Sequence, residues 1–169
     1  PLQLISTQGQ VQIHISSFRG SFSVVLSEAL RSAGLGSQVL IAQFLRGGVD
    51  QGPNGAVHLC GSLEWLRPAI ETCIPEPITE ESLSLKRKYE EKAIRELWEC
   101  CKKRLAEKKI DKIVLDEIGM AISLGFIEEK DLIFMIDNRP PSTDIILTGP
   151  SIPNKVIEMA DQITELRCN

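Results

Sequence analysis

The sequence lacks several features that would place it quickly in a class of protein. No apolar run approaches the roughly 20 residues that span a bilayer, so we expect no transmembrane helix. With 19 Lys and Arg against 23 Asp and Glu, the net charge is −4, without the basic excess typical of nucleic-acid binding. The N-terminus shows no basic-then-apolar leader pattern. We therefore expect a cytoplasmic protein that binds neither membranes nor nucleic acids.

Cysteine and histidine are too dispersed to suggest a metal centre. The five cysteines form no CxxC pair, and the only histidines, His14 and His58, each lie inside an expected strand. In a cytoplasmic protein, such cysteines are expected to be reduced thiols, several of them buried. A structural metal site needs clustered Cys or His side chains, so none is expected here.

The patterns that are present predict one α/β domain covering residues 1–169, in a chain that is 43% apolar and 25% charged. Six apolar runs bounded by turn residues predict strands, at 11–15, 38–45, 56–60, 112–118, 143–149 and 162–168. Helical patterns lie between them, at 21–33, at about 80–109, as a pair around 118–137, and at 153–160. This alternation predicts a doubly wound, mostly parallel sheet of about six strands, with helices on both faces.

The long charged helix shows an apolar stripe at steps of four residues. The stripe consists of Leu85, Tyr89, Ala93, Leu97 and Cys101. Such spacing is typical of an amphipathic helix that packs one side on a sheet. The basic runs of this helix alternate with acidic residues, and we expect them to form a solvated face.

The first strand, a tight turn and a helix follow one another as in a phosphate-binding loop, whose pattern is GxxxxGK[ST]. The window from Ser16 to Phe22 keeps the second glycine of that pattern as Gly20, but Ser21 replaces the lysine and Phe22 replaces the metal-binding hydroxyl. A full positive charge and a metal ligand are therefore missing. The free N–H groups of the helix N-terminus and the guanidinium of Arg19 remain available to an anion.

Two further stretches suggest ligand binding, and each has an ordinary structural alternative. Asp116 and Glu117 follow an apolar strand, as do the carboxylates that reach a nucleotide-bound Mg²⁺. The alternative is a pair of solvated carboxylates that cap the next helix. Trp65, expected in a loop beyond the 56–60 strand, either stacks on a flat ligand or fills the edge of the domain.

Taken together, the stretches LSEALRSAGLGSQVLIAQFLRG and LEW, and the segment from Asp111 to Arg167 with its DE, RP, LTG and ADQITELR motifs, resemble the ATP:corrinoid adenosyltransferases. The resemblance covers nearly the whole chain. It implies a P-loop NTPase-like fold, a homodimer, and transfer of the 5′-deoxyadenosyl group of ATP to a reduced corrinoid with the help of Mg²⁺. In this reaction the cobalt is the nucleophile and triphosphate leaves, so no catalytic side chain is expected.

The resemblance also implies where the ligands would bind. The nucleotide loop of the family falls on Ser17, Arg19, Gly20, Ser21 and Ser23. The Mg²⁺ ligands fall on Asp116 and Glu117, and the corrinoid-facing positions fall on Leu63 and Trp65. The arginine of the family's TGR motif is replaced by Pro150.

The departures from the family pattern collect on the phosphate side, where their combined effect weakens ATP binding, whereas the scaffold residues are kept. We therefore expect a divergent or inactive adenosyltransferase. The alternative is a non-catalytic relative that has lost ATP binding and binds a corrinoid, another ligand or a protein. An unrelated nucleotide hydrolase is a third possibility, but Ser21 and Phe22 argue against it as well.

Overall fold

The structure is a computed structural model that describes residues 8–17, 19, 23–48, 52, 54–74 and 85–166. For Leu85 only the backbone is described. Gly20, Ser21 and Phe22, which belong to the expected phosphate loop, lie outside the described residues. Arg19, Ser17 and Ser23 lie within them.

Seven described strands form one sheet in the order β3-β4-β2-β5-β6-β1-β7. Their bounds are Val11–Ser16 (β1), Val39–Gln43 (β2), Val57–Leu59 (β3), Leu63–Leu66 (β4), Lys112–Asp116 (β5), Asp144–Gly149 (β6) and Gln162–Leu166 (β7). Neighbouring strands pair in parallel except β3 and β4, which are antiparallel. The predicted doubly wound, mostly parallel sheet is confirmed, with one strand more than expected.

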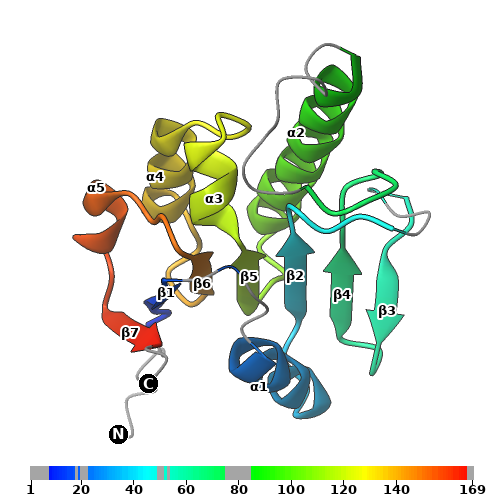
Figure 1. Cartoon of the computed structure of the whole chain (residues 1–169). Coiled ribbons are helices and arrows are strands. Elements are labelled where there is room, and N and C mark those ends of the chain that lie inside the picture. Colours follow the sequence, from blue (N-terminus) through cyan, green and yellow to red (C-terminus); the bar gives the residue numbers. More distant parts are fainter. Residues whose placement is uncertain are drawn as a thin grey trace, which may run out of the picture.

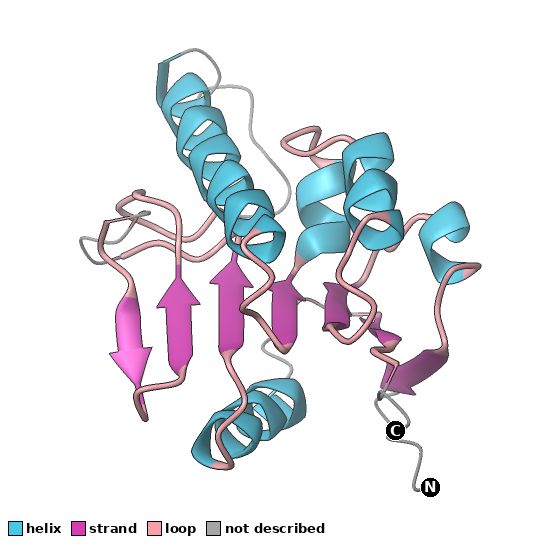
Figure 2. Cartoon of the chain, turned by 180° about the vertical axis from the view of Figure 1, so that it is seen from behind, coloured by secondary structure: helices cyan, strands magenta, loops and turns pink. Residues whose placement is uncertain are grey.

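Helices cover both faces of this sheet. Their bounds are Ser23–Gly34 (α1), Leu85–Ala106 (α2), Ile118–Ser123 (α3), Glu129–Asp137 (α4) and Asn154–Ile157 (α5). Figures 1 and 2 show α1 well separated from α2, α3 and α4. Val25 and Ala29 of α1 pack in one apolar cluster with Ile41 and Val114 of the sheet, and the other helices belong to a second, larger cluster.

The end of α1 shows how local sequence fixes an element boundary. The N–H of Gly36 donates to the carbonyl of Ala33, and the N–H of Ser37 donates to that of Ser32. Gly36 has φ 100°, so this is a Schellman cap that needs a residue without a Cβ. The chain then enters β2 directly. Because β2 runs parallel to β5, the carboxyl ends of these two strands lie side by side.

The placement of Trp65 in a loop was wrong, because Trp65 lies in strand β4. The strand was missed because the chain reverses through a three-residue loop, residues 60–62, whose first residue is a cysteine. Cys60 has φ 54° and Gly61 has φ 70°, so both lie in the left-handed region, where glycine is the usual residue. The turn aligns Leu63 with Leu59 and so starts a separate strand.

The predicted stripe of α2 is correct only in the part of the helix that reaches the sheet. Ala93, Leu97 and Cys101 are buried, whereas the side chain of Tyr89 is 57% exposed. Figure 2 shows the N-terminal part of α2 extending beyond the sheet. Among the described residues, no helix is long and apolar enough to cross a membrane.

The expectation that several cysteines are buried was too strong for the part of the chain that the structure describes. Cys101 is buried, Cys100 is partly buried, and Cys60 and Cys73 are exposed. All four are free thiols. Burial raises the pKa of the Cys101 thiol above its ordinary value, so this side chain acts as an apolar core residue.

Candidate functional site

A hydrogen-bonded network of polar side chains extends across the sheet at the carboxyl ends of its parallel strands. Gln43 ends β2, Asp116 ends β5, and the register places these two residues directly opposite each other. Thr148 lies near the end of β6, and Trp65 lies in β4 on the other side of β2. In parallel α/β sheets, ligands bind at this edge, which makes it the candidate site.

Asp116 is at the centre of this network and is buried. The hydroxyl of Thr148 donates to its Oδ1 at 2.7 Å, and the Nε2 of Gln43 donates to its Oδ2 at 2.8 Å. Loss of hydration raises the pKa of the Asp116 carboxyl, while the two hydrogen bonds act in the opposite direction. The carboxylate is therefore held in one orientation by neutral donors on two neighbouring strands.

Gln43 also forms hydrogen bonds to residues in and just after the next strand, β4. Its Oε1 accepts hydrogen bonds from the indole Nε1 of Trp65 and from the Nε of Arg67, each at 2.9 Å. The guanidinium of Arg67 lies over the Trp65 ring, 5.8 Å from its centroid. The indole is thus fixed at both its N–H and one face, and it stays partly exposed.

Glu117, the first residue after β5, is held in an unusual backbone conformation. Its φ and ψ are 58° and 27°, the left-handed region that non-glycine residues rarely adopt. Its N–H donates to Thr148 Oγ1 at 2.9 Å, which couples this turn to Asp116 through the same hydroxyl. A Cβ at the neighbouring Gly149, whose φ is 142°, would lie 3.6 Å from the Cα of Glu117. The turn directs the Glu117 side chain along the edge of the sheet toward the loop that follows β1.

Arg19 meets Glu117 there in a two-point ion pair. Its Nε lies 2.8 Å from Oε1 and its Nη2 lies 3.2 Å from Oε2. Its Nη1 donates to the carbonyl of Ile74. The Arg19 side chain is 23% exposed and that of Glu117 only 4%, so the pair is largely shielded from water. Such a fork-to-carboxylate geometry is the strongest form of side-chain ion pair.

The structure brings together some of the predicted site residues and separates others. Arg19, Glu117, Asp116 and Trp65 belong to one connected region of hydrogen bonds and packing, and both carboxylates are buried, so the idea of solvated helix-capping carboxylates was wrong. Ser17 and Ser23 are exposed, and Gly20 and Ser21 lie outside the described residues. Leu63 is 1% exposed and belongs to the α1 cluster, against which Trp65 also packs.

Sequence reasoning did not assign three residues of this site. Gln43 and Thr148 donate to Asp116, Gln43 also accepts from Trp65, and Arg67 donates to Gln43 and lies over the Trp65 ring. The available signal was their position, because each is a polar residue at or just after the carboxyl end of an apolar strand.

The residues present do not fit a bound Mg²⁺ in this arrangement. Carboxylate oxygens are suitable ligands for that ion, but both Glu117 oxygens already face a guanidinium and both Asp116 oxygens accept hydrogen bonds. Phe22 stands where the family's loop supplies a hydroxyl ligand. Among the described residues, no group of three His, Cys, Asp or Glu side chains is arranged to hold a metal.

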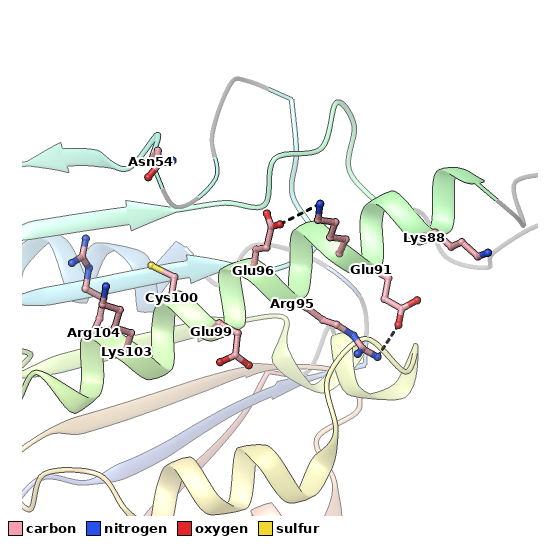
Figure 3. A pocket seen from close by; sticks show the side chains of 10 residues that line it. Asn54, Lys88, Glu91, Arg95, Glu96, Glu99, Cys100, Lys103 and Arg104 are labelled. Atoms are coloured by element: carbon pink, nitrogen blue, oxygen red, sulfur yellow. Dashed lines mark ion pairs between the residues drawn. The ribbon is translucent and has the colours of Figure 1, made fainter.

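A concave surface lies away from these residues, between α2 and the loop that carries Asn54 (Figure 3). It has a volume of about 700 Å³ and is lined mainly by charged residues, including Arg95, Glu96 and Lys103. Several of these side chains pair within the helix, as Arg95 does with Glu91 at 2.7 Å. None of the residues of the hydrogen-bonded network around Asp116 lines this concave surface, so it is not part of the candidate site.

Comparison with known proteins agrees with the sequence motifs. The family model described as ATP:corrinoid adenosyltransferase BtuR/CobO/CobP matches residues 7–169. The corrinoid adenosyltransferase of Escherichia coli strain K12 is 25% identical over 162 residues, which cover 95% of this chain and 77% of the relative. Corrinoid adenosyltransferase CobA of Salmonella typhimurium strain LT2 has the same identity and the same coverage.

One further relative is longer. Uncharacterized protein all2391 of Nostoc sp. strain PCC 7120 is 26% identical over 175 residues, which cover 94% of this chain but 44% of that protein. The part of it that this chain matches is therefore less than half of a longer polypeptide.

Proposed function

Because the chain belongs to the ATP:corrinoid adenosyltransferase family, we propose that it is a divergent member that binds a corrinoid beside Trp65 and does not perform ordinary MgATP-dependent adenosyl transfer. The observation that carries this proposal is the internal pairing of the acidic residues. Arg19 occupies both oxygens of Glu117, and Gln43 and Thr148 occupy those of Asp116.

The chemistry of adenosyl transfer explains why this pairing matters. A bond forms between cobalt and the ribose 5′ carbon, the bond from that carbon to oxygen breaks, and the triphosphate leaves with the electron pair. The protein must stabilise the charge on the leaving group, since it supplies no nucleophile. Mg²⁺ would supply a large part of that stabilisation when bound. In this chain the loop lysine is Ser21, the TGR arginine is Pro150, and the Arg19 guanidinium faces Glu117.

The expected loss is large even for a conservative count. Removing one preorganised donor from a developing anion typically lowers kcat by about 10²–10³. Two independent losses of this kind lower the rate by about 10⁴ or more. This estimate favours a binding function over the family's catalytic one.

The geometry around Trp65 supports corrinoid as the retained ligand. Its indole N–H is anchored to Gln43, which fixes the ring plane, and the residue is partly exposed. A rigid aromatic surface of this kind suits a flat macrocycle. The homodimer implied by the family is part of the same proposal, and sedimentation velocity of the purified chain tests it.

A divergent enzyme is the second candidate, and Arg46 favours it. This residue follows β2, and its positive charge partly opposes the rise in the pKa of Asp116 that burial causes. Its buried Nε has no hydrogen-bond partner among the described residues. A triphosphate bound at this edge would have Arg46 and a displaced Arg19 as cationic partners.

Calorimetry with MgATP and an anaerobic assay with cob(I)alamin separate the two candidates. The proposal predicts no heat up to millimolar MgATP, no adenosylated product, and micromolar binding of hydroxocobalamin that Trp65→Ala weakens by about tenfold or more. Tyr89→Ala, a truncation of an exposed aromatic residue, is the matched control and should not change corrinoid binding.

Other outcomes have clear meanings. Micromolar MgATP binding that is lost without Mg²⁺ or in Glu117→Ala, together with adenosylated product, establishes the divergent enzyme. A folded protein that binds neither MgATP nor a corrinoid overturns the proposal in favour of another ligand or a protein partner.

A further inference from the structure

The carboxylate that the family pattern assigns to Mg²⁺ already faces a cation supplied by the chain itself. Arg19 approaches Glu117 through two nitrogens, at 2.8 and 3.2 Å, and both oxygens of the carboxylate are engaged. The two residues are 98 positions apart, so the fold and not local sequence brings them together. The pair is therefore a tertiary feature of the strand-end site.

Several contacts hold Arg19 in this position. Its Nη1 donates to the carbonyl of Ile74, and the N–H of Ile74 in turn donates to the carbonyl of Leu45 just beyond β2. Ile74 itself is 1% exposed and belongs to the larger apolar cluster. The guanidinium is thus fixed between the loop after β1 and a buried segment that packs against the end of β2.

The Glu117 side of the pair is equally constrained. Its backbone sits in the left-handed region and is tied to Thr148 by its N–H. Its side chain is 4% exposed, so the carboxylate has little access to solvent. A buried carboxylate needs a partner of opposite charge, and here the partner is a guanidinium that cannot lose its proton.

We propose that Arg19 is a tethered cation that takes the place of the family's divalent metal at Glu117 and keeps this site metal-free. This inference deepens the proposed function and rests on it for the identity of the strand-end edge as the ligand site. It explains how the fold keeps a buried acidic pair while lacking the loop hydroxyl and lysine that accompany Mg²⁺.

The tether makes the exclusion effective at ordinary metal concentrations. A cation on the same chain has an effective concentration in the millimolar range or above, comparable to free Mg²⁺. The guanidinium also forms two directed hydrogen bonds, whereas Mg²⁺ gives up its bound water reluctantly. A divalent ion must displace Arg19 from Glu117 before it can bind.

The test is a titration with Mn²⁺ alone, read by the loss of the free-ion electron paramagnetic resonance signal. Wild-type protein should show no binding up to about 1 mM Mn²⁺, and Arg19→Gln should bind at least about tenfold more tightly. The double variant Arg19→Gln with Glu117→Gln should lose that gain. Arg139→Gln is the matched control, because Arg139 is also partly buried and donates to backbone carbonyls, at Ile136 and Gly9.

A thermal unfolding measurement accompanies each titration and shows whether the variant is folded. Arg19→Lys keeps the positive charge without the planar fork, so it provides a milder change if Arg19→Gln does not fold. It should bind Mn²⁺ more tightly than wild type, and Mn²⁺ should raise its unfolding midpoint while leaving that of wild type unchanged.

Two results overturn the inference. One is wild-type protein that binds Mn²⁺ as tightly as the Arg19 variants. The other is a folded Arg19 variant that gains no metal binding. Neither depends on ATP or a corrinoid, so a failed Mn²⁺ titration is distinguishable from a failed proposal on corrinoid binding.

Discussion

At the scale of single residues, the donor and acceptor groups of the side chains fix the direction of each hydrogen bond in the network around Asp116. Trp65 and Arg67 can only donate through their ring and guanidinium nitrogens, so Gln43 must present its oxygen to them and its amide nitrogen to Asp116. Asp116 in turn accepts from both sides. One amide side chain therefore sets the orientation of a carboxylate and an indole on different strands.

Replacing Gln43 by Leu should cost about 2–4 kcal/mol of unfolding free energy, because it removes the shared partner of Trp65, Arg67 and Asp116 from a site that is 2% exposed. Urea denaturation of the variant and wild type measures this difference. Gln12→Leu in β1 is the matched control and should stay within about 0.5 kcal/mol, since Gln12 is partly exposed and pairs with Gln10 on the surface. Equal losses in the two variants would contradict a special role for Gln43.

At the scale of elements, α2 combines a packed half and a projecting half. Trp98 is 3% exposed and meets Phe44 edge to face, with ring centroids 6.1 Å apart and an interplanar angle of 61°. Tyr89, about two turns earlier, is 57% exposed. Phe44 directly follows Gln43, so its contact with Trp98 packs the helix against the end of β2 beside the candidate site.

Trp98→Ala should therefore lower the unfolding free energy by about 3–5 kcal/mol, as truncation of a buried aromatic residue usually does. Tyr89→Ala on the same helix should change it by no more than about 0.5 kcal/mol. The indole N–H of Trp98 has no hydrogen-bond partner in the described part of the chain, so Trp98→Phe should cost less than about 1.5 kcal/mol. A large loss in Trp98→Phe would show that the N–H is satisfied after all.

The elements also show how far sequence patterns reach. The apolar runs of β5 and β6 predicted buried strands, and the position of Asp116 and Glu117 at the end of one of them was read correctly. Strand β4 escaped notice because it has four residues and follows a turn with Cys60 at a positive φ. The pairing of Arg19 with Glu117 was out of reach, since no local pattern encodes a contact between residues that only the sheet order brings together.

At the scale of the whole molecule, the sheet order places the loop after β1 near the end of β5 because only β6 lies between them. This is the arrangement that lets one nucleotide contact both segments in an active phosphate-binding fold. Here the same proximity lets Arg19 reach Glu117 instead. Global stability should therefore respond to ligands differently from that of an active enzyme.

Thermal unfolding in the presence of MgATP measures this response for the complete fold. At about 1 mM MgATP, a site with a Kd of about 10 μM adds about 2.7 kcal/mol, whereas a site with a Kd of about 1 mM adds about 0.4 kcal/mol. For a chain of 169 residues, these free energies correspond to rises in Tm of about 5–11 °C and about 1–2 °C. We expect a rise no larger than the smaller one, unchanged by adding EDTA, with the Escherichia coli relative as the positive control. A rise of the larger size that EDTA abolishes would mean that MgATP displaces Arg19 from Glu117 and still binds with a Kd of about 10 μM. That result would favour a nucleotide-binding enzyme over the proposed function.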